Sequence, residues 1–199
     1  QLRPRRHYTL PPQLLAKIVR PQAVPRPILH VKMRLITCYS DATHQCILEA
    51  IEATQGDGRH GFSVFKVSGV ASTALLQKAA ERPEQLTDEE SKAWERVQAR
   101  VDTLCSRAAE LGTPIFIDAE ETWLQRAIDA LALNQMRRHN TERAVVFNTL
   151  QLYRHDRLAY LKALTHQAAE EGWHLGVKLV RGAYMEKERE RAAERGYPS

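Results

Sequence analysis

The sequence contains few cysteines, no long apolar run and no metal-binding pattern of histidines. Only three of the 199 residues are cysteines, and this odd number without a CxxC pair argues against a disulfide framework and a thiolate zinc site. No stretch approaches the ~20 apolar residues of a membrane-spanning helix. The eight histidines form neither HxH nor HExxH, so we expect no metal site. These absences favour a protein of a reducing compartment.

Three common catalytic and nucleotide-binding motifs are also missing. No GxGxxG and no GxxxxGK[ST] precedes a candidate helix, which argues against a dinucleotide-binding fingerprint and against the phosphate loop of NTPases. No serine lies in a GxSxG context, so a serine nucleophile has no support.

Acidic residues are absent from the first forty positions. Residues 1–40 contain eight Lys or Arg and six of the nine prolines. The net charge of the whole chain is only +5, so the remainder is net acidic. We predict a basic, proline-rich leader over residues 1–40 and a folded domain over residues 41–199. Such a leader is typical of a nucleic-acid arm, a membrane-surface anchor, an organellar targeting remnant or a solvated tail. Because the body is acidic, we expect no nucleic-acid partner.

Short apolar runs alternate with segments of helical periodicity after the leader. The clearest helix is predicted over residues 88–111, where a capping box at Thr87 precedes apolar residues recurring every three or four positions, and Gly112 ends it. Further helices are predicted over 41–53, 72–81, around 123–131, 154–171 and 186–195. Strands are predicted over 62–67, 115–117, 144–150 and 174–180, with an additional one over 31–38.

This alternation predicts parallel strands joined by right-handed crossovers. Because the dinucleotide fingerprint is absent, a barrel is a better interpretation than a doubly wound sheet. A complete (β/α)8 barrel needs ~250 residues, whereas this chain has 199. We therefore predict an α/β fold, a partial TIM-like (β/α)8 barrel without its C-terminal strands and last helix, and we expect the chain to be a fragment.

Polar residues end the predicted strands, and the carboxyl ends of barrel strands are where catalysis takes place. Lys66, Asp118, Gln151 and Lys178 stand at or near four such ends. An unpaired ammonium inside an apolar strand is costly, so Lys66 needs an anionic partner, either a substrate carboxylate or Asp118. Structural alternatives stay open, namely an ion pair between strands for Lys66 and a helix cap for Asp118.

Three neighbouring features complete the predicted site. Glu120 and Glu121 are expected in a solvated first helical turn, because adjacent residues rarely converge. Lys178 and Arg181 are three positions apart, so their side chains are expected on opposite faces of the strand, one of them facing the interior. The charged segment 186–195 is expected to be a solvated helix.

Four of these segments resemble motifs of the proline dehydrogenases, flavoenzymes built on a distorted (β/α)8 barrel. Residues 178–189, KLVRGAYMEKER, are similar to the family's fifth-strand signature. Residues 65–69, 117–122 and 147–153 resemble the second, third and fourth strand motifs. The FNTxQxY and KLVRGAY motifs resemble those of the eukaryotic, mitochondrial branch more than those of the bacterial branch. The resemblance covers roughly residues 41–199, the N-terminal to central part of the catalytic barrel.

The resemblance implies roles for nine residues. Lys66 would pair with the proline carboxylate, and Tyr184 would approach the substrate ring. The catalytic roles would fall to Asp118, which helps hold the cations, and to Lys178, which stabilises the reduced flavin. The residues implied in FAD binding are Ala119, Gln151, Arg181, Gly182 and Ala183.

The chain also departs from the family pattern at two points. Bacterial members carry Arg at the position of Lys178 and Lys at that of Arg181, and Lys lacks the planar guanidinium fork. The family's last helix supplies two adjacent arginines for the substrate carboxylate, and none of its residues occur before Ser199.

The implied activity is FAD-dependent oxidation of L-proline to 1-pyrroline-5-carboxylate, the first step of proline catabolism, with electrons passing to a membrane quinone. The implied location is the matrix side of the mitochondrial inner membrane, with peripheral membrane association; the alternative is the bacterial cytoplasm. Two other hypotheses stay open. One is a Schiff-base aldolase that uses Lys66 or Lys178, and the other is a non-catalytic, truncated fragment.

Overall fold

The computed structural model describes residues 29–54, 62–182 and 184–197. The chain divides into two units, residues 1–34 and 35–199, and all contacts below lie within the second. Most of the predicted leader falls outside the described residues. Among the described helices, none is long and apolar enough to cross a membrane. The same residues contain no group of three His, Cys, Asp or Glu side chains that could hold a metal ion.

Four parallel strands form one sheet in the order in which they occur along the chain. The pairs are in register at Phe65 with Ile117, Ile117 with Asn148, and Gln151 with Val180. This arrangement confirms the predicted parallel α/β fold and all four main strands, each within the residues expected or one beyond them. The strands are β1 (Ser63–Phe65), β2 (Ile115–Ile117), β3 (Val146–Gln151) and β4 (Val177–Val180).

Helical segments precede the sheet and follow each strand. The predicted capping box of the longest connecting helix is present: the Thr87 hydroxyl accepts from the Glu90 N–H, and the Glu90 carboxylate accepts from the Thr87 N–H. Gly112 ends that helix with a φ of 66°, a conformation that glycine adopts without a Cβ penalty. The segments are α2 (Leu29–Ala53), η1 (Val67–Gly69), α3 (Thr73–Glu81), η2 (Pro83–Gln85), α4 (Asp88–Leu111), α5 (Thr122–His139), α6 (Arg157–Glu171) and α7 (Met185–Arg195).

The expected strand over residues 31–38 is wrong. These residues belong to α2, which continues without interruption into the helix predicted over 41–53. No glycine or proline occurs between Leu29 and Ala53, so nothing removes a donor or breaks the hydrogen-bond ladder. An apolar, β-branched run is therefore not enough to predict a strand when it adjoins a good helix.

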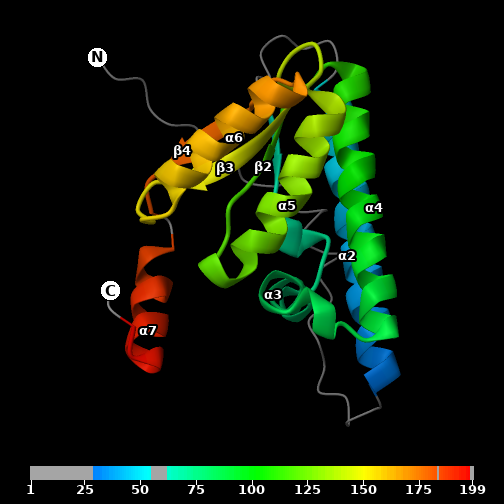
Figure 1. The fold of residues 1–199 in the computed structure, drawn as a ribbon. Helices are drawn as coiled ribbons and strands as arrows, with labels where there is room; N and C mark the ends of the chain where they lie inside the picture. Colours follow the sequence, from blue (N-terminus) through cyan, green and yellow to red (C-terminus); the bar gives the residue numbers. More distant parts are fainter. Residues whose placement is uncertain (1–28, 55–61, 183, 198–199) are drawn as a thin grey trace, which may run out of the picture. The chain divides into compact units, whose positions relative to one another are not determined.

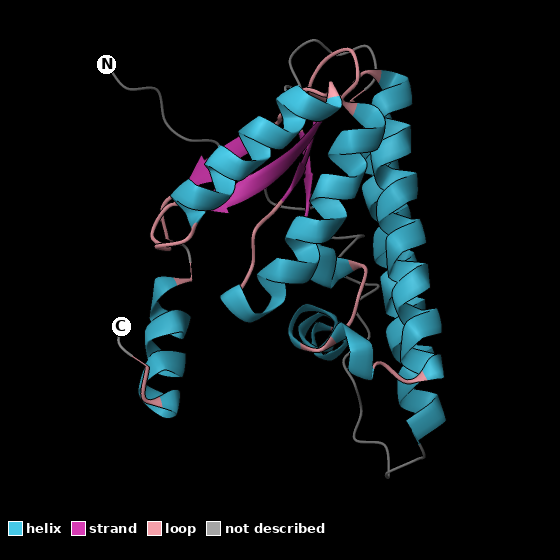
Figure 2. Ribbon diagram, in the orientation of Figure 1, coloured by secondary structure: helices cyan, strands magenta, loops and turns pink. Residues whose placement is uncertain are grey.

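One face of the sheet is buried against the helices. Phe65, Ile115 and Ile117 alternate with exposed or half-buried neighbours. Together with Val146 they pack into a core with apolar residues of α3, α4 and α5. Figures 1 and 2 show α5 and α6 beside the strands, with α2 and α4 side by side. Ion pairs from α4 to α2 join these two long helices, Arg100 with Asp41 and Arg107 with Glu52. The large helical layer thus fixes the strands that carry the site.

The opposite face of the sheet carries an aromatic cluster near the amino ends of the strands. The Phe62 and Phe116 rings are stacked with centroids 4.3 Å apart, and Phe147 meets both edge-on at 5.4 Å. Side chains two residues further along each strand lie on this same face. The next layer on that face is polar and contains Asp118, Thr149 and Lys178.

Asn140 connects the amino ends of two strands. Its side-chain Nδ2 donates to the carbonyl oxygens of Val146 and His174, each at 2.8 Å. Its Oδ1 accepts from the N–H groups of Val145 and Val146 at 3.0 and 2.9 Å. The residue is fully buried, and these four bonds use the whole capacity of a carboxamide.

Candidate active site

The carboxyl ends of the four strands surround a cavity of about 230 Å³. Six of the nine residues implied by the resemblance line it together, so the predicted convergence of the four strand ends is present. The cavity is lined by Lys66, Asp118, Ala119, Thr149, Gln151, Lys178, Val180 and Tyr184.

The other three implied residues do not line this cavity. Arg181 is exposed and Gly182 is half-buried, and neither contributes to the lining. Ala183 lies outside the described residues. The expectation that Lys178 and Arg181 diverge is confirmed, because Lys178 lies in the cavity and Arg181 faces solvent.

Asp118 and Lys178 form an ion pair across the sheet. Lys178 Nζ lies 2.8 Å from Asp118 Oδ1, and the Thr149 hydroxyl donates weakly to the same oxygen at 3.4 Å. The ammonium also lies 5.2 Å from the Phe116 ring centroid, a distance at which the ring face attracts a cation. Asp118 therefore acts on Lys178 and makes no helix cap, which decides one alternative left open by the sequence.

Lys66 is held by Tyr184 rather than by Asp118. Its Nζ donates to the Tyr184 hydroxyl at 3.1 Å, and this bond raises the pKa of the lysine above its usual value. Lys66 is therefore a cation at neutral pH, with further N–H donors free for an anion. A Schiff-base nucleophile needs a lowered pKa, so the geometry at Lys66 disfavours the aldolase hypothesis.

Gln151 lines the cavity and has a buried side-chain oxygen without a partner among the described residues. The side chain is 2% exposed, and its Nε2 donates to the Glu120 carbonyl at 2.5 Å. Its Oε1 is buried and has no hydrogen-bond partner among the described residues. A buried polar atom without a partner costs about 1–3 kcal/mol. This oxygen is therefore the atom of the cavity-lining residues at which an additional N–H donor would be most favourable.

The expectation that Glu120 and Glu121 form a solvated turn is wrong. Glu120 is 3% exposed, and its carboxylate accepts from the Ser68 N–H at 2.9 Å. Glu121 forms an ion pair with Lys187 at 2.7 Å. The sequence prediction missed Glu120 because it asked only whether Glu120 and Glu121 lie close to each other. It did not consider a contact between Glu120 and the η1 turn. The available signal was its position directly between a buried strand and a helix.

Helix α7 is attached to α5, so it is not simply the solvated helix expected from its charge. The Glu188 carboxylate accepts from the Thr122 N–H at 2.9 Å and from its hydroxyl at 2.8 Å. Arg191 lies 4.3 Å from the Trp123 ring centroid and pairs with Glu81. These contacts hold the start of α7, and hence Tyr184, beside the cavity. The highly charged sequence of α7 gives no periodic signal for this role.

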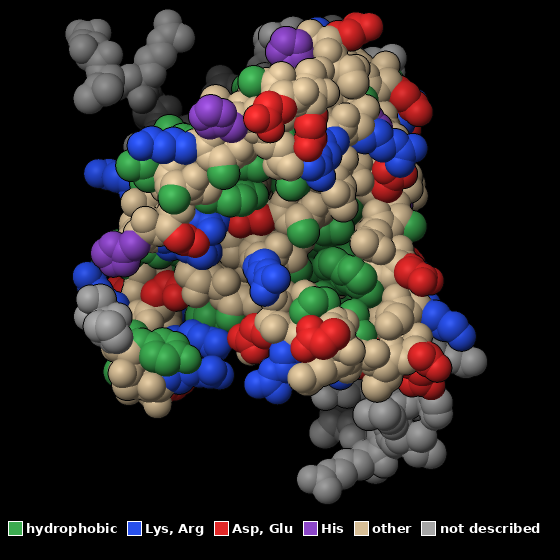
Figure 3. All heavy atoms as spheres, viewed as in Figure 1, with side chains coloured by type: hydrophobic (Ala, Val, Ile, Leu, Met, Phe, Trp, Pro, Cys, Tyr) green, Lys and Arg blue, Asp and Glu red, His purple; other side chains and the backbone are tan. Residues whose placement is uncertain are grey.

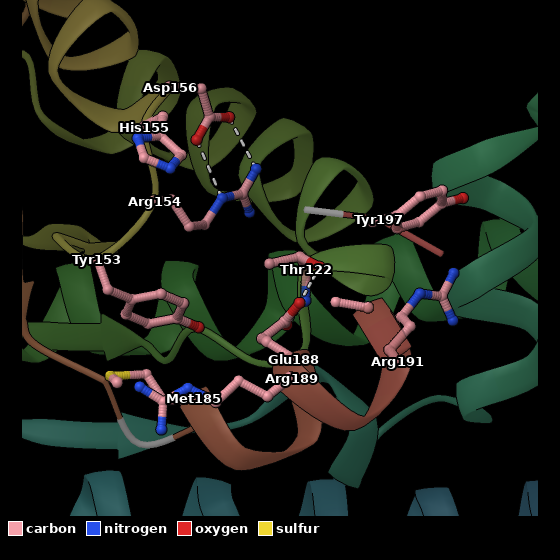
Figure 4. A pocket seen from close by; sticks show the side chains of 11 residues that line it. Thr122, Tyr153, Arg154, His155, Asp156, Met185, Glu188, Arg189, Arg191 and Tyr197 are labelled. Carbon is pink, nitrogen blue, oxygen red and sulfur yellow. Dashed lines mark hydrogen bonds and ion pairs between the residues drawn. The ribbon is translucent and has the colours of Figure 1, made fainter. Parts of the chain in front are cut away.

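A larger cavity of about 540 Å³ lies between α7 and the turn from β3 to α6 (Figure 4). Some of its polar groups are paired, Arg154 with Asp156 and Glu188 with Thr122. Arg154 Nη1 and the Tyr153 hydroxyl are buried without a partner among the described residues. Burial raises the pKa of Tyr153 in its wall to about 12, so this phenol is neutral. None of the four predicted strand-end residues lines this cavity, and volume alone does not make it the site.

The surface charges on the face shown in Figure 3 favour neither an anionic nor a cationic ligand. Acidic and basic side chains lie interspersed there, with apolar patches between them. Selection therefore depends on the local groups of the strand-end cavity, chiefly the Lys66 cation and the Asp118–Lys178 pair.

Comparison with known proteins identifies the family. The family model described as proline dehydrogenase matches residues 16–199. The chain belongs to the proline dehydrogenase family. This finding confirms the resemblance carried by the four strand motifs.

Several curated relatives, two of them named proline dehydrogenases, are similar in sequence over most of this chain. Proline dehydrogenase 1, mitochondrial, of Homo sapiens is 40% identical over 141 residues, covering 71% of this chain and 23% of its own length. The Caenorhabditis elegans protein of the same name is 41% identical over 136 residues, covering 68% and 21%. The carbapenem antibiotics biosynthesis protein CarD of Pectobacterium carotovorum is 36% identical over 149 residues, covering 75% and 39%. The chain thus spans less than half the length of these relatives.

Solved structures agree with the fold of a proline dehydrogenase domain. A mutant of proline utilization A from Bradyrhizobium japonicum superposes with a TM-score of 0.65 at 18% identity, covering 80% of this chain and 16% of that protein. Proline utilization A from Bdellovibrio bacteriovorus gives 0.61 at 19% identity, covering 82% and 17%. The four-stranded sheet and its helices therefore correspond to part of that TIM-like domain.

Proposed function

We propose that the protein oxidises L-proline to 1-pyrroline-5-carboxylate with FAD as its cofactor, the first step of proline catabolism. The observation that carries this proposal is the single cavity in which Lys66, the Asp118–Lys178 pair and the unpaired Gln151 oxygen meet. It offers a cation for a carboxylate, a second cation for negative charge on a ring system, and an acceptor for an N–H group.

The residues of the cavity fit a flavin. Gln151 Oε1 is an unsatisfied acceptor suited to a heterocycle N–H, and the small Ala119 side chain in the lining leaves room for a flat ring. Arg181, Gly182 and Ala183 are the further FAD contacts we propose from the family motif. When bound, FAD supplies the two-electron acceptor for oxidation of the carbon next to the proline nitrogen.

The chain's own residues bind and orient the substrate. Lys66 is charged and directed by Tyr184, so it attracts the proline carboxylate and fixes one end of the molecule. Tyr184 lies beside that cation and places an aromatic wall against the substrate ring. Lys178 stabilises negative charge in the cavity, and Asp118 keeps its ammonium in place.

We further propose that the electrons pass to a membrane quinone and that the protein works at the matrix side of the mitochondrial inner membrane. The human and Caenorhabditis elegans relatives are named as mitochondrial. Such an acceptor requires peripheral contact with the membrane. A bacterial, cytoplasmic setting remains the alternative, and it is tested by locating the tagged full-length protein in fractionated cells.

Dye reduction by the full-length protein tests the activity. Proline should reduce the dye in the presence of FAD, and Lys66→Ala should raise the KM for proline about 10- to 100-fold, because a charge-assisted bond contributes about 1.5–3 kcal/mol. Lys162→Ala is the matched control, since Lys162 is an exposed lysine on α6. Absence of proline-dependent reduction, or an unchanged KM in Lys66→Ala, would overturn the proposal. Borohydride trapping of a substrate on Lys66 or Lys178 would favour the aldolase instead.

A further inference from the structure

Gln125, in the second turn of α5, is a buried carboxamide that bonds on both sides. It is 1% exposed. Its Oε1 accepts from the Glu120 N–H at 3.0 Å, and its Nε2 donates to Asp129 Oδ1 at 2.9 Å. Gln125 does not line the cavity, so it contacts neither substrate nor cofactor in the proposed reaction.

Asp129 fixes the orientation of Gln125. A carboxylate only accepts hydrogen bonds, so the amide nitrogen of Gln125 must face Asp129 and its oxygen must face Glu120. Asp129 is itself held, because Asn148 Nδ2 donates to it at 3.0 Å and Arg157 pairs with it at 2.6 Å. Both members of that ion pair are at most 8% exposed. The orientation of Gln125 is therefore set by a buried, charge-compensated network.

Glu120 transmits this orientation to the cavity. Its N–H donates to Gln125, its carbonyl accepts from Gln151 Nε2 at 2.5 Å, and its carboxylate accepts from the Ser68 N–H. Because a carbonyl only accepts, it fixes the amide nitrogen of Gln151 on that side. The Gln151 oxygen is thereby left as the unpaired end.

We propose that Gln125 is a positioning residue, which through the backbone of Glu120 sets where the Gln151 oxygen lies in the cavity wall. The proposal rests on the proposed function, since a flavin is the ligand expected to meet that oxygen. At metal sites, partners that orient the ligating groups affect metal affinity or activity about 10- to 100-fold, and we expect an effect of similar size for a residue that orients a flavin contact. Gln125 therefore belongs to the machinery of the site, although it lies outside the cavity.

The test uses Gln125→Met in the full-length protein, because Met has a similar volume and cannot accept from Glu120. We expect FAD titration of the apoprotein to show about tenfold weaker binding, together with a shifted flavin midpoint potential and a lower kcat at a nearly unchanged KM for proline. Gln135→Met is the matched control. Gln135 is a buried glutamine on the same helix whose Oε1 has no partner among the described residues, and this variant should keep the wild-type affinity and potential.

A second variant keeps the proposal testable if Gln125→Met does not fold. Gln125→Glu retains the acceptor for Glu120 but faces the Asp129 carboxylate, so FAD binding should weaken. Wild-type FAD affinity and potential in Gln125→Met, or wild-type FAD affinity in Gln125→Glu, would overturn the positioning role. Failure of the wild-type protein to bind FAD would instead overturn the proposed function.

Discussion

Asn140 and Gln151 are both buried carboxamides, and they lie at opposite ends of β3. Asn140, before the amino end, makes all four hydrogen bonds that its side chain allows. Gln151, at the carboxyl end, makes one and leaves a buried oxygen without a partner among the described residues. Folding alone explains the first residue. Gln151 instead retains an unsatisfied oxygen at the end of the sheet where a ligand is expected. A structural end and a functional end of one sheet therefore differ in how completely their buried polar groups are hydrogen-bonded.

The largest effect is expected from Asn140→Leu. Leucine removes four bonds and leaves buried backbone groups of Val145 and Val146 and the part-buried carbonyl of His174 without this partner, so the free energy of unfolding should fall by about 3 kcal/mol or more. Urea denaturation of the full-length protein measures this. A loss below about 1 kcal/mol would show that water or relaxation satisfies these groups and that the amino end is not held by this side chain.

Gly176→Ala is expected to be the next most damaging change. A Cβ at this position would lie 2.4 Å from the Val146 carbonyl oxygen and 3.0 Å from the Phe147 ring, and overpacking of this kind costs about 1–3 kcal/mol. Gly172→Ala provides the contrast, since its Cβ would meet nothing within 4 Å but its φ is +72°. That left-handed conformation costs about 1 kcal/mol. The same denaturation experiment should therefore rank Gly176→Ala as the worse variant.

Gln151→Leu reverses the pattern seen at Asn140. It loses one hydrogen bond and also removes the unpaired oxygen, so the free energy of unfolding should change by less than about 1 kcal/mol. FAD affinity and kcat/KM for proline should nevertheless fall about tenfold. A large loss of stability with unchanged FAD binding would contradict the distinction between the two ends of β3.

The sequence was sufficient for features that depend on local patterns. Periodicity and the capping box at Thr87 located α4, and apolar runs located all four strands. Convergence of Lys66, Asp118, Gln151 and Lys178 followed from parallel topology, because carboxyl ends of neighbouring strands share one edge. The family motifs added the roles of these side chains.

Contacts between distant segments could not be predicted in the same way. The bond from Glu120 to Ser68 and that from Glu188 to Thr122 each join residues more than fifty positions apart. Acidic residues at a helix start or in a charged helix are usually solvated, so a local pattern favours the wrong answer for both. The network of Gln125 was missed for a related reason, since a single Gln on an amphipathic helix carries no distinctive spacing.

The smallest effect concerns an exposed ion pair near the amino end of the sheet. Arg137 donates to Glu171 at the end of α6, and the Trp173 ring N–H donates to the same carboxylate. The Arg137 bonds lower the pKa of Glu171 from 4.5 to about 2. Because the folded-state pKa is depressed, the unfolded state binds more protons in this range, and stability rises with pH. The contribution is therefore present above about pH 4.5 and is lost as the pH falls towards 2.

Glu171→Gln removes this pH dependence. It tests whether the exposed Arg137–Glu171 pair stabilises the amino end of the sheet in addition to the buried hydrogen bonds of Asn140. The unfolding free energy of the wild type should drop more between pH 6 and pH 3 than that of the variant, and added salt should reduce the difference because both partners are solvated. Glu170→Gln is the control, since Glu170 is the exposed neighbour of Glu171 and its carboxyl group makes none of these bonds. Equal pH dependence in the two variants would mean that the amino end owes its stability to buried polar groups alone.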